Sequence, residues 1–154
     1  MTFAANFAAC TRTKKQTMTI SESAVAFTVQ PIGRIHSTLL RLEDCPLQGS
    51  ENAPAASLEI YRPYLDGIKN LAVGDKLLLL TWFHLADRNV LTCYRRNMVG
   101  GEVFGVFSTR SPDRPNPIGL HEVTVLEIID ECTIKIFPME ARNGTPVIDI
   151  KPLI

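Results

Sequence analysis

The sequence lacks several features that would assign it to a broad functional class at once. Its 16 basic and 16 acidic residues leave a formal net charge of zero. No global field therefore attracts nucleic acid, and any RNA contact must use a local basic patch or a second subunit. The longest apolar run, residues 76–85, is about strand length and falls short of the roughly 18 residues that span a bilayer. We therefore expect no membrane segment.

Clustered metal ligands and nucleotide-binding glycine motifs are missing as well. The four cysteines are widely spaced, without a CxxC pair or a His–Cys cluster. This spacing fits neither a zinc site nor a disulfide framework, so we expect no metal and reduced thiols in a cytoplasmic protein. No GxGxxG follows a strand-like segment, and strands do not alternate with helices, which argues against a Rossmann-type fold.

The first 26 residues differ in composition from the rest. Residues 1–21 contain three basic and no acidic side chains and are rich in threonine and alanine, as in a weak transit peptide. A second methionine, Met18, precedes the first organised segment. We therefore favour a disordered leader, or a translation start at Met18 instead of Met1, over a targeting signal. The folded domain is expected to cover residues 27–154.

Short strand-like segments dominate that domain. They cover residues 27–36, 57–61, 76–85, 102–107, 120–129, 133–137 and 147–150. One short helix is expected at 64–71, and residues 42–57 and 87–101 have the composition of loops. Residues 130–132 join two strands as a hairpin, and Asn143-Gly144 is typical of a tight turn. The pattern predicts an all-β fold, a compact barrel or sandwich, mostly antiparallel, with one short helix and long loops.

A proline-rich loop, Thr109–Gly119, is the most unusual segment. Three prolines within six positions fix the backbone and remove donors, so the loop cannot join a sheet and loses little entropy on closing over a ligand. Asn116 stands between two prolines with an amide that both donates and accepts. Arg110 and Arg114 supply planar cations suited to carboxylate or phosphate. The residues alone leave two interpretations open, a rigid turn with solvated arginines or a ligand-binding loop.

A second polar block, Asn143–Pro152, ends the chain. Asp149 and Lys151 fall on the same face of an extended segment, since side chains alternate with period two. They are either a surface ion pair or a functional pair, with Asp149 as acceptor or base and Lys151 as partner of an anion. His84 ends the apolar strand and is open to the same two readings. His36 and His121 have no motif around them and are interpreted as structural or surface residues.

Taken together, these blocks resemble a known family. The resemblance rests on Pro31-Ile32-Gly33, Tyr64–Ile68, Trp82-Phe83-His84, Gly105–Leu120 and Asn143–Pro152, in that order. They are similar to the TsaA-like family, whose characterised members are tRNA methyltransferases O of the YaeB type. The resemblance implies a small β-barrel that forms a homodimer and binds S-adenosylmethionine near the subunit interface. It further implies N6-methylation of threonylcarbamoyladenosine at position 37 of tRNA.

Roles for individual residues follow from the same resemblance. It implies cofactor contacts by Arg110, Ser111, Arg114, Asn116, Gly119, Leu120 and Thr145. Asp149 and His84 are the candidate bases, and Arg95, Arg96 and Lys151 are the candidate contacts to the substrate. Residues 43–56 lack the usual arginine and glutamine pair, and the additional C-terminal domain of some bacterial members is missing. The alternative is therefore a binding module for S-adenosylmethionine, or a small-molecule methyltransferase, without tRNA activity.

Overall fold

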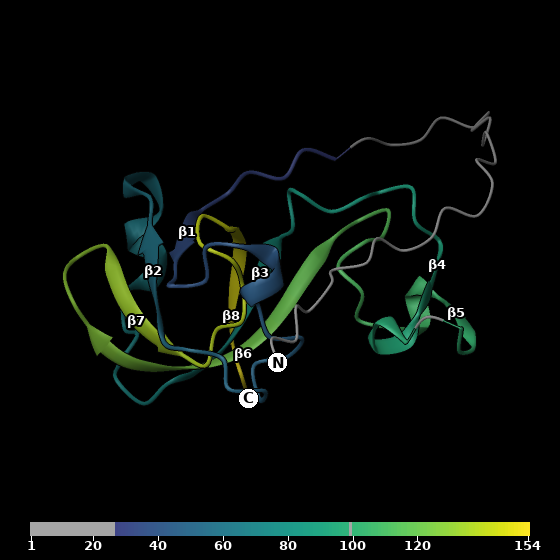
Figure 1. Cartoon of the computed structure of the whole chain (residues 1–154). Coiled ribbons are helices and arrows are strands. Elements are labelled where there is room, and N and C mark those ends of the chain that lie inside the picture. Colours follow the sequence, from purple (N-terminus) through teal and green to yellow (C-terminus); the bar gives the residue numbers. More distant parts are fainter. Residues whose placement is uncertain (1–26, 99) are drawn as a thin grey trace.

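Six antiparallel strands close into a barrel in the order β1-β2-β7-β6-β3-β8 (Figure 1). The structure is a computed structural model that describes residues 27–98 and 100–154, so the expected leader lies outside the described residues. The closed barrel confirms the all-β prediction. Its strands are β1 (Gly33–His36), β2 (Ala56–Ile60), β3 (Lys76–Trp82), β6 (Ile118–Ile128), β7 (Thr133–Phe137) and β8 (Pro146–Pro152).

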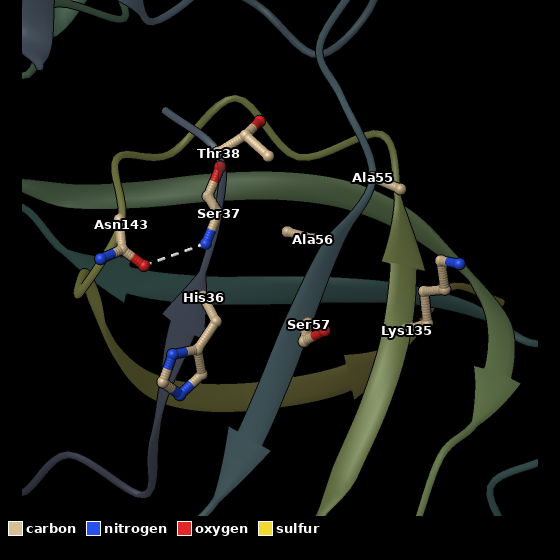
Figure 2. Close-up of a pocket in the computed structure, with 8 residues that line it drawn as sticks. All are labelled: His36, Ser37, Thr38, Ala55, Ala56, Ser57, Lys135 and Asn143. Atoms are coloured by element: carbon tan, nitrogen blue, oxygen red, sulfur yellow. Dashed lines mark hydrogen bonds between the residues drawn. The ribbon is translucent and has the colours of Figure 1, made fainter. Parts of the chain in front are cut away.

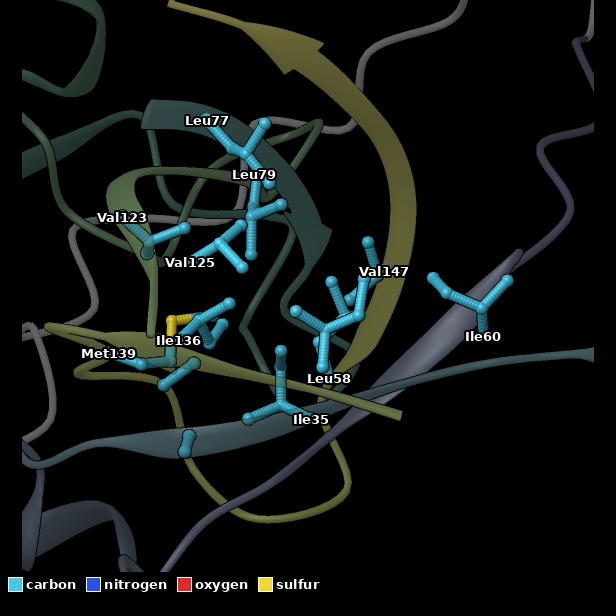
Figure 3. Close-up of a cluster of buried hydrophobic side chains, with 13 residues drawn as sticks. Ile35, Leu58, Ile60, Leu77, Leu79, Val123, Val125, Ile136, Met139 and Val147 are labelled. Carbon is cyan, nitrogen blue, oxygen red and sulfur yellow. The ribbon is translucent and has the colours of Figure 1, made fainter. Parts of the chain in front are cut away.

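Alternating side chains fill the barrel with an apolar core. Along β3, Leu77 and Leu79 point inward and are almost fully buried, while the alternate residues Leu78 and Leu80 are partly exposed. The other strands contribute in the same way, because successive side chains of a strand point to opposite faces. Figure 3 shows the resulting cluster, which includes Ile35, Leu58, Val125, Ile136, Met139 and Val147. Burial of these side chains stabilises the barrel by about 1.5–3 kcal/mol for each large one.

A two-stranded ribbon stands apart from the barrel, at the right of Figure 1. It pairs β4 (Thr92–Tyr94) with β5 (Val103–Gly105). The first of these strands lies in the stretch 87–101, which was expected to be a loop. The prediction was wrong because three residues carry too little alternation to be recognised without their partner strand.

Two further expectations about local structure need correction. The short helix is a 3-10 helix at Arg62–Ile68, one residue after β2 and with a proline in its first turn. The first strand was expected over 27–36 but begins only at Gly33, because Pro31 has no N–H for the ladder. The remaining 3-10 turns are Leu42–Asp44, Arg95–Asn97 and Val106–Ser108.

Strand direction brings the two polar sequence blocks to the same end of the barrel. β3 pairs Trp82 with Ile118, next to the last residue of the proline-rich loop. It also pairs Thr81 with Val147, two residues after the Asn143–Thr145 turn. β1 ends there as well, because Ile35 donates its amide to the carbonyl of Thr145. We call this end of the barrel the loop end.

Candidate functional site

The proline-rich loop is held by donors that lie around it. Its prolines offer carbonyl groups but no N–H, so the surrounding residues must do the donating. Nε of Arg88 donates to the carbonyl of Pro115 at 2.8 Å, and the amide of Phe83 donates to the carbonyl of Pro117 at 2.9 Å. The amide of Asp87 donates to the carboxylate of Asp113 at 2.8 Å. The segment that follows β3 therefore fixes the loop along its length.

Arg114 fixes the other half of the loop from inside. Its Nε donates to the carbonyl of Ser111 at 2.7 Å, and its Nη2 donates to the carbonyls of Val106 and Thr109. A guanidinium group suits this task because it presents several N–H donors in one plane. The side chain of Arg114 thus has a structural role in the free protein, and its predicted contact with a cofactor stays a prediction.

Two residues of the loop remain available to a ligand. Arg110 and Asn116 are both exposed, and within the described part of the chain neither side chain has a hydrogen bond or ion pair. Prolines on both sides hold Asn116 in place, so its amide is presented with little conformational freedom. Ser111 is half-buried between them. The loop therefore presents one cation and one amide toward solvent at the loop end.

Gly119 packs against the barrel interior where the loop ends. A Cβ atom added there would lie 2.7 Å from Nε2 of His121 and 2.5 Å from the ring of Phe83, and would also overlap Oγ1 of Thr81. No side chain fits in this space. Packing in the free protein therefore explains why this residue is a glycine. A close approach of the cofactor to Gly119 stays a prediction.

The second polar block forms a tight turn beside the loop end. Gly144 has a φ of +82°, in the left-handed region that favours glycine, as expected for the Asn-Gly pair. The hydroxyl of Thr145 is buried and donates to the carbonyl of Arg142 at 2.7 Å, which closes the turn. Asn143 accepts a hydrogen bond from the amide of Ser37 at 3.1 Å and so ties the turn to the end of β1.

An open depression of about 320 Å³ lies next to this turn (Figure 2). The hydrogen bond between Asn143 and Ser37 forms one side of it, and His36, Ser57 and Lys135 line its floor and far side across β1, β2 and β7. The complete lining is His36, Ser37, Thr38, Ala55, Ala56, Ser57, Lys135 and Asn143. Small side chains at Ala55 and Ala56 leave the depression open.

Three further predicted residues lie on the outer face of the barrel. Leu120 and Asp149 lie on either side of Leu80 of β3, which pairs with both, so Leu120, Leu80 and Asp149 form a row across the sheet. Lys151 lies one row further and its Nζ is 2.7 Å from the carboxylate of Asp149. The predicted shared face is thus confirmed. Exposed ion pairs contribute little to stability, which leaves both groups free for another role.

The remaining predicted residues lie beyond the barrel. His84 is exposed just after β3, and Arg95 and Arg96 follow β4 in the ribbon. The guanidinium of Arg95 lies 4.4 Å above the ring of Phe104, in a cation–π contact. Nη2 of Arg96 is 2.7 Å from the carboxylate of Glu51. His84 thus lies just past the loop end, whereas Arg95 and Arg96 belong to the ribbon.

Sequence reasoning missed the residues that anchor the loop. Arg88 is one of them, and its guanidinium also lies 5.5 Å above the ring of Trp82. His121, predicted as structural or surface, is buried in the barrel and bonds to Thr81 and Glu140. No local sequence pattern indicates these roles, because each partner lies far away in the sequence.

In residues 27–98 and 100–154, no group of three or more histidine, cysteine or acidic side chains is arranged to hold a metal ion. None of the helices in those ranges has the length and apolar character needed to cross a membrane.

The fold and the two loops define a small antiparallel barrel with a proline-rich loop and an Asn-Gly-Thr turn at one end. Comparison of the sequence with known protein families shows which class of protein has this barrel. Residues 34–154 match the model of the tRNA-methyltransferase O N-terminal domain, and the chain belongs to that family.

Named relatives and a solved structure agree with this assignment. A probable S-adenosyl-L-methionine-binding protein of Methanothermobacter thermautotrophicus is 38% identical over 80% of this chain and 88% of its own length. An S-adenosyl-L-methionine-binding protein of Archaeoglobus fulgidus is 37% identical over 80% of this chain and 86% of its own. The crystal structure of TrmO from Pseudomonas aeruginosa superimposes with a TM-score of 0.64 at 28% identity and covers 84% of this chain. The match spans 56% of that solved chain.

Proposed function

We propose that this protein binds S-adenosylmethionine at the loop end of the barrel and transfers its methyl group. The observation that carries the proposal is the meeting of the proline-rich loop and the Asn143–Thr145 turn at one end of the barrel. The relatives named as S-adenosyl-L-methionine-binding proteins support the choice of cofactor. Their family supports the methyltransferase activity.

The side chains at the loop end suit the chemical groups of this cofactor. Arg110 is an exposed guanidinium without an ion pair in the described ranges, and it can hold the carboxylate of the methionine part bidentately. Asn116 can both donate to and accept from adenine or ribose. Ile118 and Leu120 present exposed apolar surface beside the loop, against which a flat base can pack. Ser111 and Thr145 complete the set, through backbone groups in the case of the buried threonine.

The methyl acceptor that we propose is N6 of threonylcarbamoyladenosine at position 37 of tRNA. When bound, the cofactor supplies an electrophilic methyl group on a positively charged sulfur. The protein must hold the N6 nitrogen in line with that methyl group, and orientation of this kind contributes up to about 7–11 kcal/mol. It must also accept the proton that N6 loses, for which Asp149 and His84 are the candidates.

Basic side chains on the ribbon and on β8 support an RNA substrate. Arg95 carries its charge above an aromatic ring and has no ion pair in the described ranges, so it can contact phosphate or stack on a base. Arg96 and Lys151 are paired with Glu51 and Asp149, and RNA must compete for them. In this proposal the reaction takes place in the cytoplasm, with tRNA as the substrate.

A homodimer is part of the proposal. Ile118 and Leu120 expose more than two-fifths of their surface on the outer face of β6, beside the partly exposed Leu80 and Trp82 of β3. A contiguous apolar face of this kind marks an interaction site. A second copy that covers it would lie next to the loop end and could complete the cofactor site there.

The test is a methylation assay on purified components. The protein is incubated with S-adenosylmethionine and with tRNA that carries threonylcarbamoyladenosine, and the digested nucleosides are analysed by mass spectrometry. We expect a gain of one methyl group on that nucleoside alone. Cofactor binding without this gain would contradict the tRNA activity and favour the binding module or the small-molecule enzyme. Absence of cofactor binding would overturn the whole proposal.

A further inference from the structure

Three polar side chains from distant segments form a buried chain of hydrogen bonds at the loop end. Oγ1 of Thr81 on β3 is 2.8 Å from Nε2 of His121 on β6. Nδ1 of the same imidazole is 2.7 Å from the carboxylate of Glu140, in the segment that follows β7. Thr81 is fully buried, His121 is 3% exposed, and the carboxylate side chain of Glu140 is 17% exposed.

This chain is confined to one end of an otherwise apolar barrel. In the described ranges, the residues that are buried despite polar side chains are Thr81, His121 and Thr145, and all of them lie at the loop end. Burying such groups costs free energy unless their hydrogen bonds are made. Here they are made, since no buried side-chain nitrogen or oxygen of the described residues lacks a partner.

The donor and acceptor roles fit together. The carboxylate of Glu140 accepts from Nδ1–H, which fixes the orientation of the imidazole ring. Nε2 is then an acceptor for the hydroxyl of Thr81 when the ring is neutral, and a donor to it when the ring is protonated. In both states the bonds of His121 are satisfied, so the ring has one preferred position.

The chain contacts the part of the proline-rich loop that enters β6. Gly119 lies directly over Thr81 and His121, with no room for a Cβ atom between them. The ring of Phe83 meets the ring of His121 edge to face at 5.9 Å, and the amide of Phe83 holds the carbonyl of Pro117. The position of the imidazole therefore sets the position of the residues that end the loop.

The same chain reaches the second polar block. Glu140 lies three residues before Asn143, and Arg142 between them supplies the carbonyl that closes the Asn143–Thr145 turn. Met139, next to Glu140, anchors this segment by donating its amide to the carbonyl of Pro54. A hydrogen bond from His121 to Glu140 thus connects the end of the proline-rich loop to the segment that leads into the turn.

We infer that Thr81, His121 and Glu140 are positioning residues that hold the Pro117–Gly119 end of the proline-rich loop in register with the Asn143–Thr145 turn. The part of this inference that concerns cofactor affinity rests on the proposed function, and the part that concerns the loop does not. The side chains of Thr81 and His121 are buried in the barrel, and that of Glu140 is mostly buried, so we assign them no direct contact with the cofactor. They act through Gly119 and Phe83.

A purely apolar cluster would fill the same volume without this effect. Valine has nearly the shape of threonine, but it lacks the hydroxyl that bonds to Nε2, so the imidazole would be held by Glu140 alone. Directional bonds in a water-free interior specify one arrangement, whereas apolar contacts tolerate several. The substitution Thr81→Val therefore separates positioning from packing.

The first experiment measures the loop in the cofactor-free protein. Hydrogen exchange of the Phe83 amide reports the bond to Pro117. We expect Thr81→Val to speed this exchange about 10-fold, the size of one lost hydrogen bond. Thr81→Ser restores the hydroxyl and should return the rate to within about 2-fold of wild type. The control is Val123→Ala, on the same inward face of β6, which lowers the unfolding temperature and leaves the Phe83 exchange rate unchanged.

The second experiment measures affinity for S-adenosylmethionine by calorimetry on the same variants. Thr81→Val should weaken binding about 5-fold to 10-fold, and Thr81→Ser and Val123→Ala should not. His121→Gln keeps a polar group near the position of Nε2, and His121→Asn keeps one near that of Nδ1. Each should therefore weaken binding less than His121→Ala does. Equal effects of Thr81→Val and Val123→Ala on exchange would overturn the positioning role. A wild-type protein that binds no S-adenosylmethionine would refute the proposed function and leave the exchange test valid.

Discussion

Gly119 of β6 pairs with Thr81 of the adjacent strand β3, and the space between them admits no side chain. This relationship gives the end of the proline-rich loop a fixed depth relative to the barrel interior. Packing in the free protein therefore requires a glycine at position 119, whether or not a ligand binds.

The tightness of this contact predicts the effect of Gly119→Ala. The added methyl group would overlap Thr81 and His121, and overpacking of this kind costs about 1–3 kcal/mol in the free energy of unfolding. Gly105→Ala is the matched control, because its added Cβ meets nothing within 4 Å and its φ of −64° suits alanine. Urea denaturation of both variants checks the difference. Equal stabilities would contradict the packing that we describe.

Arg114 holds the carbonyl groups of Thr109 and Ser111 in its own loop and that of Val106 just before it, which predicts that lysine cannot replace it. A single ammonium lacks the planar fork, so Arg114→Lys should lower the free energy of unfolding by about 1–3 kcal/mol. Arg110→Lys changes an exposed arginine without a partner in the described ranges and should stay within about 0.5 kcal/mol of wild type. If chemical denaturation gives the two variants the same stability, the structural role of Arg114 is wrong.

The turn between β6 and β7 predicts a defined response to acid. The amide of Cys132 donates to the carboxylate of Asp130, and this bond, followed by those from the Cys132 and Thr133 side chains, lowers the pKa of Asp130. A lowered pKa contributes stability above the unfolded value of about 3.9 that is lost as pH falls through the folded value. Asp130→Asn should thus be less stable than wild type at pH 7 and equally stable once the pH is below the folded pKa. Thermal unfolding from pH 7 to pH 2 follows this difference, and a constant gap would contradict it.

The outer apolar face predicts the assembly of the protein. We expect the wild type to be a dimer by light scattering, and Leu120→Asp to be a monomer, because a buried carboxylate costs several kcal/mol without a partner. Val73→Asp is the control, since Val73 is exposed at the opposite end of β3. A monomeric wild type, or a dimer that survives Leu120→Asp, would exclude this face as the interface.

The predictable part of the fold is the part with local causes. The apolar run at residues 76–85, the alternation along 133–137, the hairpin at 130–132 and the Asn143-Gly144 turn depend on neighbours in sequence, and the structure confirms a strand or turn at each. The ribbon strand at Thr92–Tyr94 depends on a partner strand and was missed. The hydrogen bonds inside the loop end were missed for the same reason. Thr81 and His121 are 40 residues apart, and their bond follows only from the register of β3 and β6.

The candidate site shows the same division. Residue types in the proline-rich loop predicted its stiffness and its exposed amide at Asn116. They did not predict that Arg114 would bond to the loop itself, because a sequence pattern assigns a charge but not its partner. Gly119 was selected for close approach to a ligand, and the structure gives it a packing reason from within the barrel.

The central claim is that S-adenosylmethionine binds between the proline-rich loop and the Asn143–Thr145 turn. The most direct measurement is hydrogen exchange by mass spectrometry of the full chain with and without S-adenosylmethionine, in the wild type and in Asn116→Ala. We predict slower exchange in residues 106–120 and 142–147 on binding, and affinity about 5-fold to 10-fold weaker in Asn116→Ala, as for one lost hydrogen bond. Protection confined to other segments, or unchanged affinity in Asn116→Ala together with unprotected loops, would contradict the account.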